Sequence, residues 1–471
     1  MGMDYISTRG SAPALNFEDV TLAGLASDGG LYIPRAWPTM SEADIAALAG
    51  LSYVETAVRV MLPYVEGSLT EDELRGLCEQ AYGRFSHAAI TPLRQLDHQQ
   101  WLLELFHGPT LAFKDVALQL LGQLFERFLS NRDDHLTIVG ATSGDTGSAA
   151  IDAVAGRAKI DIFMLHPEGR VSDVQRRQMT TVIAPNVHNI AIDGSFDDAQ
   201  AMVKRIFADT DVTDRFTISA VNSINWARLM AQVVYYFYAA VRLGAPYRQV
   251  AFSVPTGNFG DVFAGYVAAQ MGLPVAQLIV ATNVNDILHR ALSSGDYSTS
   301  IVTPTATPSM DIQVSSNFER LLFDRGGRDG LALAEQMRAF EASKAMMLTN
   351  AQREGASTLF TSARADSDQM MKALRWAYEA TGEAIDPHTA VGLSAARQIA
   401  LDPSIPIVTL ATAHPAKFRD AVERATGIRP ALPARIGSLF EREERYEKLP
   451  GTYEAVRDYV TAHATPGKGR A

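Results

Sequence analysis

The chain has 471 residues, of which 47% are hydrophobic and 20% are charged, a composition typical of a folded globular protein rather than of long disordered tracts. Its formal net charge is -11 at pH 7, so its charge gives no reason to expect nucleic acid or an anionic membrane surface as a partner. Cys78 is the single cysteine, which excludes an intramolecular disulfide and a cysteine-based metal cluster, and we expect no metal site. We expect Cys78 to be a small buried residue on a helix.

The amino terminus and the hydropathy favour a cytoplasmic protein. Asp4 stands where a signal peptide would need its apolar core. No stretch of the chain reaches the roughly 20 apolar residues of a membrane span, so no membrane partner is expected. The sequence leaves the oligomeric state open between a monomer and a small homo-oligomer.

The periodicity of the chain changes between its first section and the rest. Residues 1–90 predict a mainly helical domain, because 41–50 and 70–82 each open with a Ser or Thr N-cap followed by acidic and helix-spaced apolar residues. From residue 136, β-branched or apolar runs alternate with amphipathic helices, which predicts an α/β fold with parallel sheets covered by helices on both faces. Seven runs are expected as strands, at residues 136–142, 160–165, 188–192, 216–221, 250–256, 277–282 and 406–412.

Two glycine-rich turns each follow a predicted strand and precede a predicted helix. They are SGDTG (143–147) and GNFGD (257–261). In such a turn, backbone N–H groups converge at the positive end of the helix dipole, which suits a phosphate or a carboxylate. For either turn alone, a tight connection in which glycine supplies a positive φ is the better interpretation, but two such turns favour anion binding.

Lys114 lies between two apolar stretches in FHGPTLAFKDVALQLLGQLF (106–125). A lysine on the apolar side of a buried helix loses its charge or pairs it, and burial lowers its pKa toward that of a nucleophilic amine. A Schiff-base lysine requires such an environment. The alternative is a lysine that extends to the surface or pairs with Asp115.

A third anion site is indicated by VNSINWARLM (221–230), which begins a long predicted helix. Arg228 could hold a phosphate bidentately, with Ser223 and Asn225 as further donors. The alternative is a helix capped by Ser223, with Arg228 on the surface.

The last predicted strand leads into TLATAHPAKF (409–418). At its end, the hydroxyl of Thr412 could hydrogen-bond an uncharged ring nitrogen. Lys417 follows the turn-forming Pro415. By itself this segment is also consistent with a plain strand end and turn.

Taken together, these segments resemble threonine synthases of the branch with an added N-terminal domain. The family shares an opening YxSTRG, here YISTRG (5–10), and then HGPTLAFKD, TSGDTG, NSINWAR, PTGNFGD and TAHPAKF in this order. The similarity runs from residue 5 to about residue 418 and therefore covers most of the chain.

The resemblance implies a fold-type II pyridoxal-phosphate (PLP) enzyme, similar in architecture to tryptophan synthase β subunits, with two open, mostly parallel α/β sheet domains. A large PLP-binding domain is expected at residues 91–135 and 226–430. A smaller domain is expected at 136–225, carrying the loop for the substrate carboxylate. Residues 431–471 are expected to form a C-terminal extension.

The resemblance also implies a role for each residue of the matching motifs. Lys114 would be the Schiff-base lysine for pyridoxal 5'-phosphate, and Thr412 would contact the pyridine nitrogen. The cofactor phosphate would lie in the loop of Gly257, Asn258, Phe259, Gly260 and Asp261. The substrate carboxylate would be received by Thr142, Ser143, Asp145 and Thr146, and the substrate phosphate by Ser223, Asn225 and Arg228. Many related enzymes have Asn where Asp145 stands, which leaves the contact of Asp145 open.

The implied reaction converts O-phospho-L-homoserine and water to L-threonine and phosphate, by β,γ-elimination followed by water addition. The alternatives are another PLP phospholyase and a threonine or serine dehydratase on the same fold. A dehydratase is disfavoured, because the hydrogen-bond donors of residues 223–228 would then have no substrate phosphate to bind. A catalytically silent PLP-binding homologue would be expected to have lost costly polar residues, yet Lys114, Thr412 and Arg228 are all present.

Overall fold

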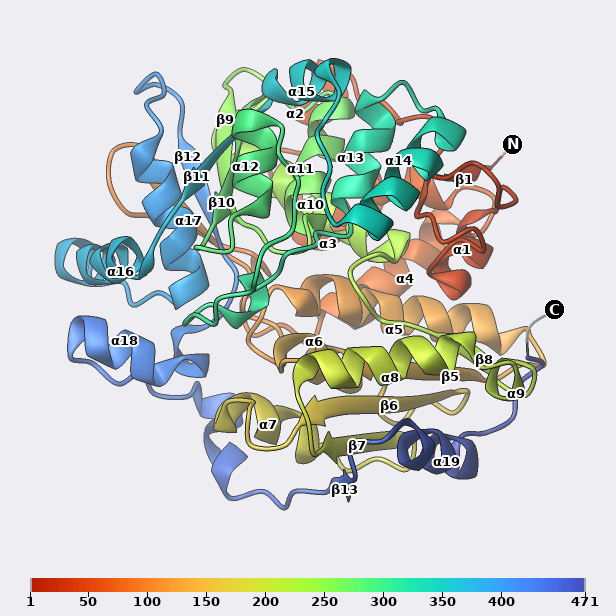
Figure 1. The fold of residues 1–471 in the computed structure, drawn as a ribbon. Helices are drawn as coiled ribbons and strands as arrows, with labels where there is room; N and C mark the ends of the chain where they lie inside the picture. Colours follow the sequence, from red (N-terminus) through yellow and green to blue (C-terminus); the bar gives the residue numbers. More distant parts are fainter. Residues whose placement is uncertain (1, 470–471) are drawn as a thin grey trace.

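Two open sheets, each covered by helices on both faces, make up the computed structural model, which describes residues 2–469 (Figure 1). The larger sheet has six strands in the order β11-β10-β9-β12-β4-β3, and the smaller has five in the order β13-β7-β6-β5-β8. Neighbouring strands in both sheets are parallel except β3 and β4. This confirms the predicted mostly parallel α/β architecture.

All seven predicted strands are present. They are β5 (Leu136–Ala141), β6 (Ile160–Pro167), β7 (Val187–Ile192), β8 (Thr217–Ser219), β9 (Val250–Pro255), β10 (Val275–Thr282) and β12 (Ile407–Ala411). The strands that the periodicity missed have three to five residues each, too few for an alternating pattern to stand out. They are β1 (Tyr5–Ser7), β2 (Tyr32–Pro34), β3 (Leu93–Gln95), β4 (Gln100–Glu104), β11 (Phe360–Arg364) and β13 (Glu447–Leu449).

The helices fall into three groups. Those of the N-terminal section are α1 (Phe17–Ala23), α2 (Glu42–Ala46), α3 (Tyr53–Val65) and α4 (Glu71–Tyr82). Those that follow strands of the smaller sheet or pack on it are α6 (Asp145–Val154), α7 (Asp173–Thr180), α8 (Phe196–Ala208), α9 (Thr210–Thr213), the 3₁₀ helix η3 (Ala434–Phe440) and α19 (Tyr453–His463). The remainder are α5 (Lys114–Ser130), α10 (Trp226–Arg242), α11 (Gly260–Gln270), α12 (Ile287–Ser294), η1 (Pro308–Met310), α13 (Phe318–Arg325), α14 (Gly330–Ser343), α15 (Asn350–Ser357), α16 (Ser367–Thr381), α17 (Pro387–Gln398), η2 (Pro415–Lys417) and α18 (Arg419–Thr426).

Helix α5 lies between the two halves of the molecule (Figure 1). It packs against α6 of the smaller domain on one side and against α10 on the other. Buried leucines occur along much of its length, as the apolar stretch after Lys114 predicts. The first residue of this helix is Lys114, so the amine lies at the boundary between the two halves.

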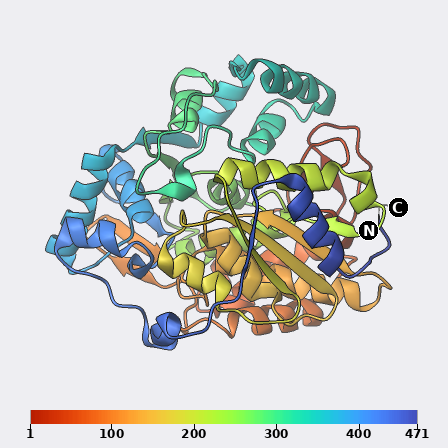
Figure 2. The same ribbon diagram turned by 60° about the horizontal axis from the view of Figure 1, so that its bottom comes forward.

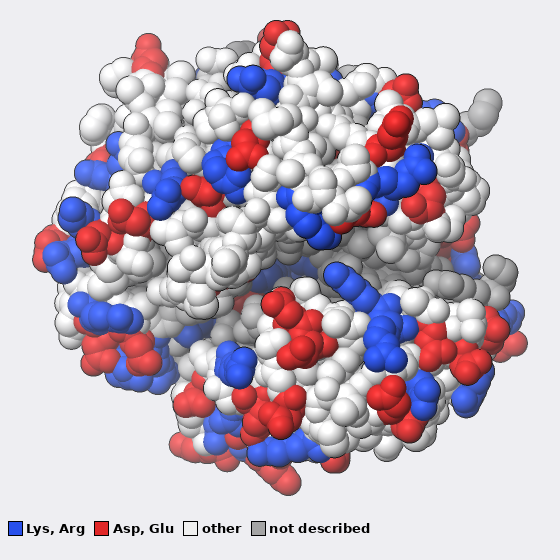
Figure 3. Space-filling view, viewed as in Figure 1, with Lys and Arg blue, Asp and Glu red and all other residues white. Residues whose placement is uncertain are grey.

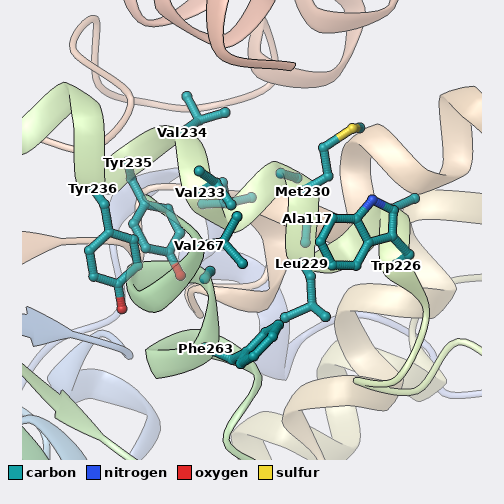
Figure 4. Close-up of a cluster of buried hydrophobic side chains, with 14 of the residues drawn as sticks. Ala117, Trp226, Leu229, Met230, Val233, Val234, Tyr235, Tyr236, Phe263 and Val267 are labelled. Carbon is teal, nitrogen blue, oxygen red and sulfur yellow. The ribbon is translucent and has the colours of Figure 1, made fainter. Parts of the chain in front are cut away.

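The N-terminal section shares its core with α10 rather than forming a core of its own. Trp226, fully buried, lies with its ring centroid 5.9 Å from that of Tyr5 and 5.7 Å from that of Tyr64. Figure 4 shows Trp226 at one end of a row of α10 side chains that includes Leu229, which points toward Phe263 of α11. Cys78 is buried on helix α4, as expected, and burial raises the pKa of its thiol to about 12.

The C-terminal segment continues the smaller domain. Strand β13 pairs in parallel with β7, and α19 packs on α8; Figure 2 shows this dark blue segment running along the smaller sheet. Residues 431–469 are therefore better described as part of the smaller domain than as an extension. Among residues 2–469, no helix has the length and the apolar character that crossing a membrane requires.

We expect Trp226→Ala to lower the free energy of unfolding by about 3–5 kcal/mol, because it removes the largest fully buried side chain at the junction between the N-terminal section and α10. Denaturant unfolding measures this change. The control is Tyr247→Ala, which removes an aromatic side chain that is 84% exposed and should change the free energy by no more than about 0.5 kcal/mol. Equal losses in the two variants would contradict the shared core.

Candidate active site

Lys114 occupies the first turn of α5, and its side chain is 11% exposed. Its amine lies 3.6 Å from Oδ2 of Asp145. The alternative pairing with Asp115 is not observed, because that carboxylate accepts hydrogen bonds from the backbone N–H and the hydroxyl of Thr110 at 2.8 and 2.7 Å. Burial lowers the pKa of Lys114, and the charges of Lys417 and Arg228 lower it further, against the opposing effect of Asp145.

Asp145 begins α6 and lies between two lysines. Its Oδ1 accepts hydrogen bonds from the ammonium of Lys417 and from Nε2 of Gln175, both at 2.8 Å, while its Oδ2 faces Lys114. Burial alone would raise the pKa of the Asp145 carboxyl, but Lys417 and Lys114 together hold it well below its usual range. Asp145 is therefore a carboxylate at every physiological pH.

The two glycine-rich turns lead into helices without a side-chain cap, α6 after Gly144 and α11 after Phe259. Gly144 has φ of 134°, and a Cβ there would lie 2.6 Å from the Gln175 side chain, so the turn requires glycine. Phe259 adopts a left-handed conformation with φ of 62°, a strained state for a residue other than glycine that occurs mostly at functional sites. Uncapped first turns leave backbone N–H groups available to an anion.

The side chains of these turns divide between holding the loop and facing the cleft. The hydroxyl of Thr142 accepts hydrogen bonds from the backbone N–H groups of Gly144 and Gly147, each at 2.9 Å, so it fixes the loop. Ser143 and Thr146 are only half-buried.

The GNFGD loop packs closely against a following segment. A Cβ on Gly257 would lie 2.5 Å from the carbonyl oxygen of Ser309, and the hydroxyl of Ser315 donates to the carbonyl oxygen of Gly257 at 2.7 Å. The carbonyl oxygen of Asn258 accepts from the backbone N–H and from Nδ2 of Asn317, at 3.1 and 3.0 Å. Side chains of two later residues, 315 and 317, thus hold the first part of this loop in place, and neither was found from the sequence.

Asp261 of the same turn directs its carboxylate away from the loop and toward α10. Its Oδ1 accepts from the hydroxyls of Tyr235 and Tyr236 at 2.5 and 3.1 Å; Figure 4 shows these two rings side by side on α10. Burial raises the pKa of Asp261 to about 6, although both tyrosines act to lower it. The hydroxyl of Tyr236 also donates to the backbone carbonyl oxygen of Asp261 at 2.9 Å, so this residue ties the turn to α10 through its side chain and its backbone.

Arg228 is buried, with 3% of the residue exposed, which contradicts the alternative of a surface arginine. Its Nη1 donates to the carbonyl oxygen of Val221 at 2.9 Å, and its Nε has no hydrogen-bond partner among residues 2–469. Burial lowers the pKa of Arg228 to about 10. A buried guanidinium with no carboxylate paired to it in the described chain is an incomplete ion pair, and such a group is normally completed by an anion.

The cap of α10 is Asn225 and not Ser223, so that alternative was wrong as well. Oδ1 of Asn225 accepts from the backbone N–H of Ala227 at 3.0 Å, and its Nδ2 donates to the carbonyl oxygen of Thr21 at 2.9 Å. Both ends of this amide are thereby used in shaping the turn. Ser223 remains half-buried, and its carbonyl oxygen accepts from Asn317 at 3.1 Å.

Thr412 follows β12 and lies beside the residue that precedes Lys114. Its carbonyl oxygen accepts from the backbone N–H of Phe113 at 2.8 Å, and its own N–H donates to the hydroxyl of Thr389 at 3.2 Å. These bonds bring the end of β12 to the start of α5. The predicted residues of the glycine-rich turns, of 223–228 and of Thr412 thus lie on elements that meet around α5.

The space-filling view shows a hollow between the two halves of the molecule, with basic side chains visible on its floor (Figure 3). A separate cavity of about 240 Å³ lies between the N-terminal section and residues 297–341. In that cavity Arg9 already pairs with Glu319 at 3.1 Å and with Glu341 at 3.0 Å, and the remaining lining is largely apolar. We therefore assign the chemistry to the surroundings of Lys114 and not to this cavity.

Comparison with known proteins agrees with this geometry. The chain matches the family models described as "Threonine synthase N terminus" over residues 4–82, "Pyridoxal-phosphate dependent enzyme" over 85–413 and "Threonine synthase, C-terminal" over 389–460. A threonine synthase of Pseudomonas aeruginosa is 56% identical over 467 residues, 99% of this chain and 100% of that protein. The chain belongs to the threonine synthase family. It is thus identified with PLP-dependent lyases of fold type II.

Solved structures extend the comparison to the whole fold. A PLP-bound threonine synthase from Brucella melitensis superposes with a TM-score of 0.95 at 50% identity, covering 100% of both chains. A yeast threonine synthase superposes with a TM-score of 0.92 at 39% identity, covering 98% of both chains. The human protein "Threonine synthase-like 2" is 36% identical over 453 residues, which are 94% of this chain and 93% of that protein.

The residues present fit pyridoxal 5'-phosphate, the cofactor of this family. The uncapped first turn of α11 suits its phosphate. Lys114, an amine of lowered pKa, would hold its carbonyl carbon. When bound, PLP supplies an electron sink for charge that develops next to the amino group of the substrate.

The orientation of Asp261 predicts a pH effect on stability. In the cofactor-free chain, the folded state should take up a proton on Asp261 as the pH falls through about 6, whereas the unfolded chain takes it up only near pH 4. Relative to Asp261→Asn, the wild type should therefore gain up to about 3 kcal/mol between pH 7 and pH 4. Urea unfolding across this range measures the difference. Asp368→Asn, an exposed change on α16, is the control, and parallel curves for wild type and Asp261→Asn would contradict the assignment.

Proposed function

We propose that this protein converts O-phospho-L-homoserine and water to L-threonine and inorganic phosphate. The observation that carries the proposal is Arg228, a buried guanidinium with an unpartnered Nε, close enough to Lys114 for its charge to lower the pKa of that amine. The substrate brings a carboxylate and a phosphate, and the cofactor brings a second phosphate. The first turn of α6, the first turn of α11 and Arg228 provide one position for each anion.

For the cofactor, we propose that Lys114 holds the carbonyl carbon and that Gly257, Asn258, Phe259, Gly260 and Asp261 surround the phosphate with backbone N–H groups. The side chain of Asp261, bonded to Tyr235 and Tyr236, would anchor this turn to α10. Thr412 would present its hydroxyl to the ring nitrogen. A hydroxyl partner leaves that nitrogen without a proton and moderates the electron sink.

For the substrate carboxylate, we propose that Ser143, Thr146 and the backbone of the α6 turn are the donors. Thr142 would act by holding the turn, since its hydroxyl already accepts two backbone N–H groups. Asp145 would not touch the carboxylate, because two anions would repel each other in a site of low dielectric constant. Its role is taken up below.

For the substrate phosphate, we propose Arg228 with the hydroxyl of Ser223, while Asn225 would set the shape of the turn. Arg228 would stabilise the phosphate as it leaves and keep it near the carbon to which water is added. Nζ of Lys114 would remove the proton from Cα and then one from Cβ, and would return protons after water addition. A lowered amine pKa favours these transfers near neutral pH.

The deciding experiment incubates the PLP-loaded protein with O-phospho-L-homoserine and identifies the organic product together with the phosphate. Equal amounts of threonine and phosphate are the expected result. Phosphate accompanied by 2-oxobutyrate would replace the proposal with a phospholyase on the same site. Absence of turnover would remove the substrate assignment and leave only the family.

We expect Arg228→Ala to lower kcat/KM for O-phospho-L-homoserine by roughly 10- to 100-fold, the loss that corresponds to one or two charge-assisted hydrogen bonds. Steady-state kinetics measure this loss, and product inhibition by inorganic phosphate should weaken in parallel. The control is Arg242→Ala, at the other end of α10 and exposed. Because Arg228 is assigned to the substrate and not to the cofactor, PLP absorbance should remain. An unchanged kcat/KM would rule out the phosphate pocket.

A further inference from the structure

Lys417 is a second buried lysine in the site, and the assignments above give it no role. It ends the 3₁₀ turn η2, which follows β12, and its side chain is 0% exposed. The turn is fixed locally, because the backbone N–H of Ala416 donates to Nδ1 of His414 at 3.1 Å. A fully buried ammonium is costly unless its charge is matched, so its partners define what it does.

The ammonium of Lys417 has two partners. It donates to Oδ1 of Asp145 and to the carbonyl oxygen of Thr110, both at 2.8 Å. Across residues 2–469, no second carboxylate lies at ion-pair distance from it. Nε2 of Gln178 donates to the same carbonyl oxygen of Thr110 at 2.9 Å. Lys417 is thereby held in one position, with its charge directed at Asp145.

The two lysines share Asp145 unequally. Lys417 lies at hydrogen-bonding distance from Oδ1, at 2.8 Å, whereas Lys114 is 3.6 Å from Oδ2, beyond the usual range of a hydrogen bond. Gln175 donates to the same oxygen as Lys417 and therefore helps to turn the carboxylate toward Lys417. The primary counter-ion of Asp145 is thus Lys417.

We propose that Lys417 is a positioning residue that neutralises and orients Asp145, so that the amine of Lys114 is not held as an ammonium by that carboxylate. The inference rests on the proposed role of Lys114 as the lysine that carries the cofactor and moves protons. It also accounts for a carboxylate beside the loop assigned to the substrate carboxylate. Because Lys417 matches the charge of Asp145, an incoming anion would meet an ion pair with no net charge instead of a lone carboxylate.

The charged groups around Lys114 support this arrangement. Asp145 faces it from α6, Lys417 from η2 and Arg228 from α10. Asp115, on α5 itself, is bonded to Thr110. Burial lowers the pKa of Lys114, Asp145 raises it, and Lys417 and Arg228 lower it again. Removing the charge of Lys417 alone would leave Lys114 as the one lysine beside Asp145. The pKa of the Lys114 amine would then rise.

The pair also predicts that the two residues can be replaced only together. An amide at position 145 would be neutral and would leave the buried ammonium of Lys417 unmatched. An apolar side chain at position 417 would leave the carboxylate of Asp145 with Lys114 as its one remaining lysine. Replacing both removes one positive and one negative charge, so their opposing effects on the field at Lys114 should partly cancel.

The test is a double-mutant cycle with Lys417→Met, Asp145→Asn and the combined variant, in the full chain. The probe is trace acetylation by acetic anhydride of the cofactor-free protein from about pH 6 to pH 10, which reports the unprotonated fraction of each amine. Mass spectrometry of the peptide that contains Lys114 gives its midpoint. Exposed Lys344 in the same sample is the internal reference, and thermal denaturation checks folding.

We expect Lys417→Met to raise the midpoint of Lys114 by about one pH unit, which is about tenfold slower acetylation at a given pH below the midpoint. Asp145→Asn should lower the midpoint, and the combined variant should lie between the two single variants, because Asp145 acts on Lys114 more strongly than Lys417 does. Lys344 should acetylate alike in all four proteins. A Lys417→Met protein that is less stable but has an unchanged Lys114 midpoint would overturn the proposal, because Lys417 would then be merely structural.

Should Lys417→Met fail to fold, the comparison of Asp145→Asn with the combined variant still decides. Adding Lys417→Met to Asp145→Asn should raise the midpoint of Lys114, and no change would again overturn the proposal. Neither substrate nor turnover enters this measurement. Failure of the proposed reaction would appear only in the product assay, with the order of the midpoints intact.

Discussion

A single buried carboxylate joins the two halves of this molecule at the site. Asp145 begins α6 of the smaller domain, while Lys114 begins α5 and Lys417 ends the turn after β12 of the larger sheet. Buried charges must be matched where they stand, because moving any one of them leaves an uncompensated ion in a site of low dielectric constant. The ion pairs therefore tie the two sheets together beside Lys114, and the groups that form them also act on the pKa of its amine.

The path of the chain explains why the cations gather there. The chain passes from the larger to the smaller sheet after α5, returns before α10, and passes again after α18 to form β13. Lys114 begins α5, the helix before the first passage, and Arg228 lies in the first turn of α10, after the second passage. Lys417 lies two residues before α18, the helix that precedes the third passage. Parallel strands in each sheet place their following turns at one edge. Three segments that are far apart in the sequence thus bring their cationic side chains close together.

The sequence was sufficient where local rules decide the structure. Runs of β-branched or apolar residues predicted seven of the strands, and the glycine-rich turns after β5 and β9 were predicted to lead into helices. The sequence did not predict features that depend on contacts between residues far apart in the chain. Nothing local shows that Asn225 rather than Ser223 caps α10, because the choice depends on the carbonyl oxygen of Thr21. Gln175 was missed because a glutamine on a polar helix gives no signal of its own. Lys417 stood in a recognised motif, but its partner Asp145 is distant in the sequence.

The N-terminal section shapes the turn that leads to Arg228 through contacts with backbone carbonyl groups. Besides the bond from Asn225 to Thr21, the buried Arg320 donates to the carbonyl oxygens of Tyr32 and Ile224, at 2.8 and 2.6 Å through Nη2. One guanidinium thereby ties strand β2 to the turn that leads to Arg228. Because Trp226 packs against Tyr5 and Tyr64 in the same region, the start of α10 is held on its apolar side as well. The position of Arg228 is therefore set from outside the α/β sheets, which gives the added domain a physical reason to be present.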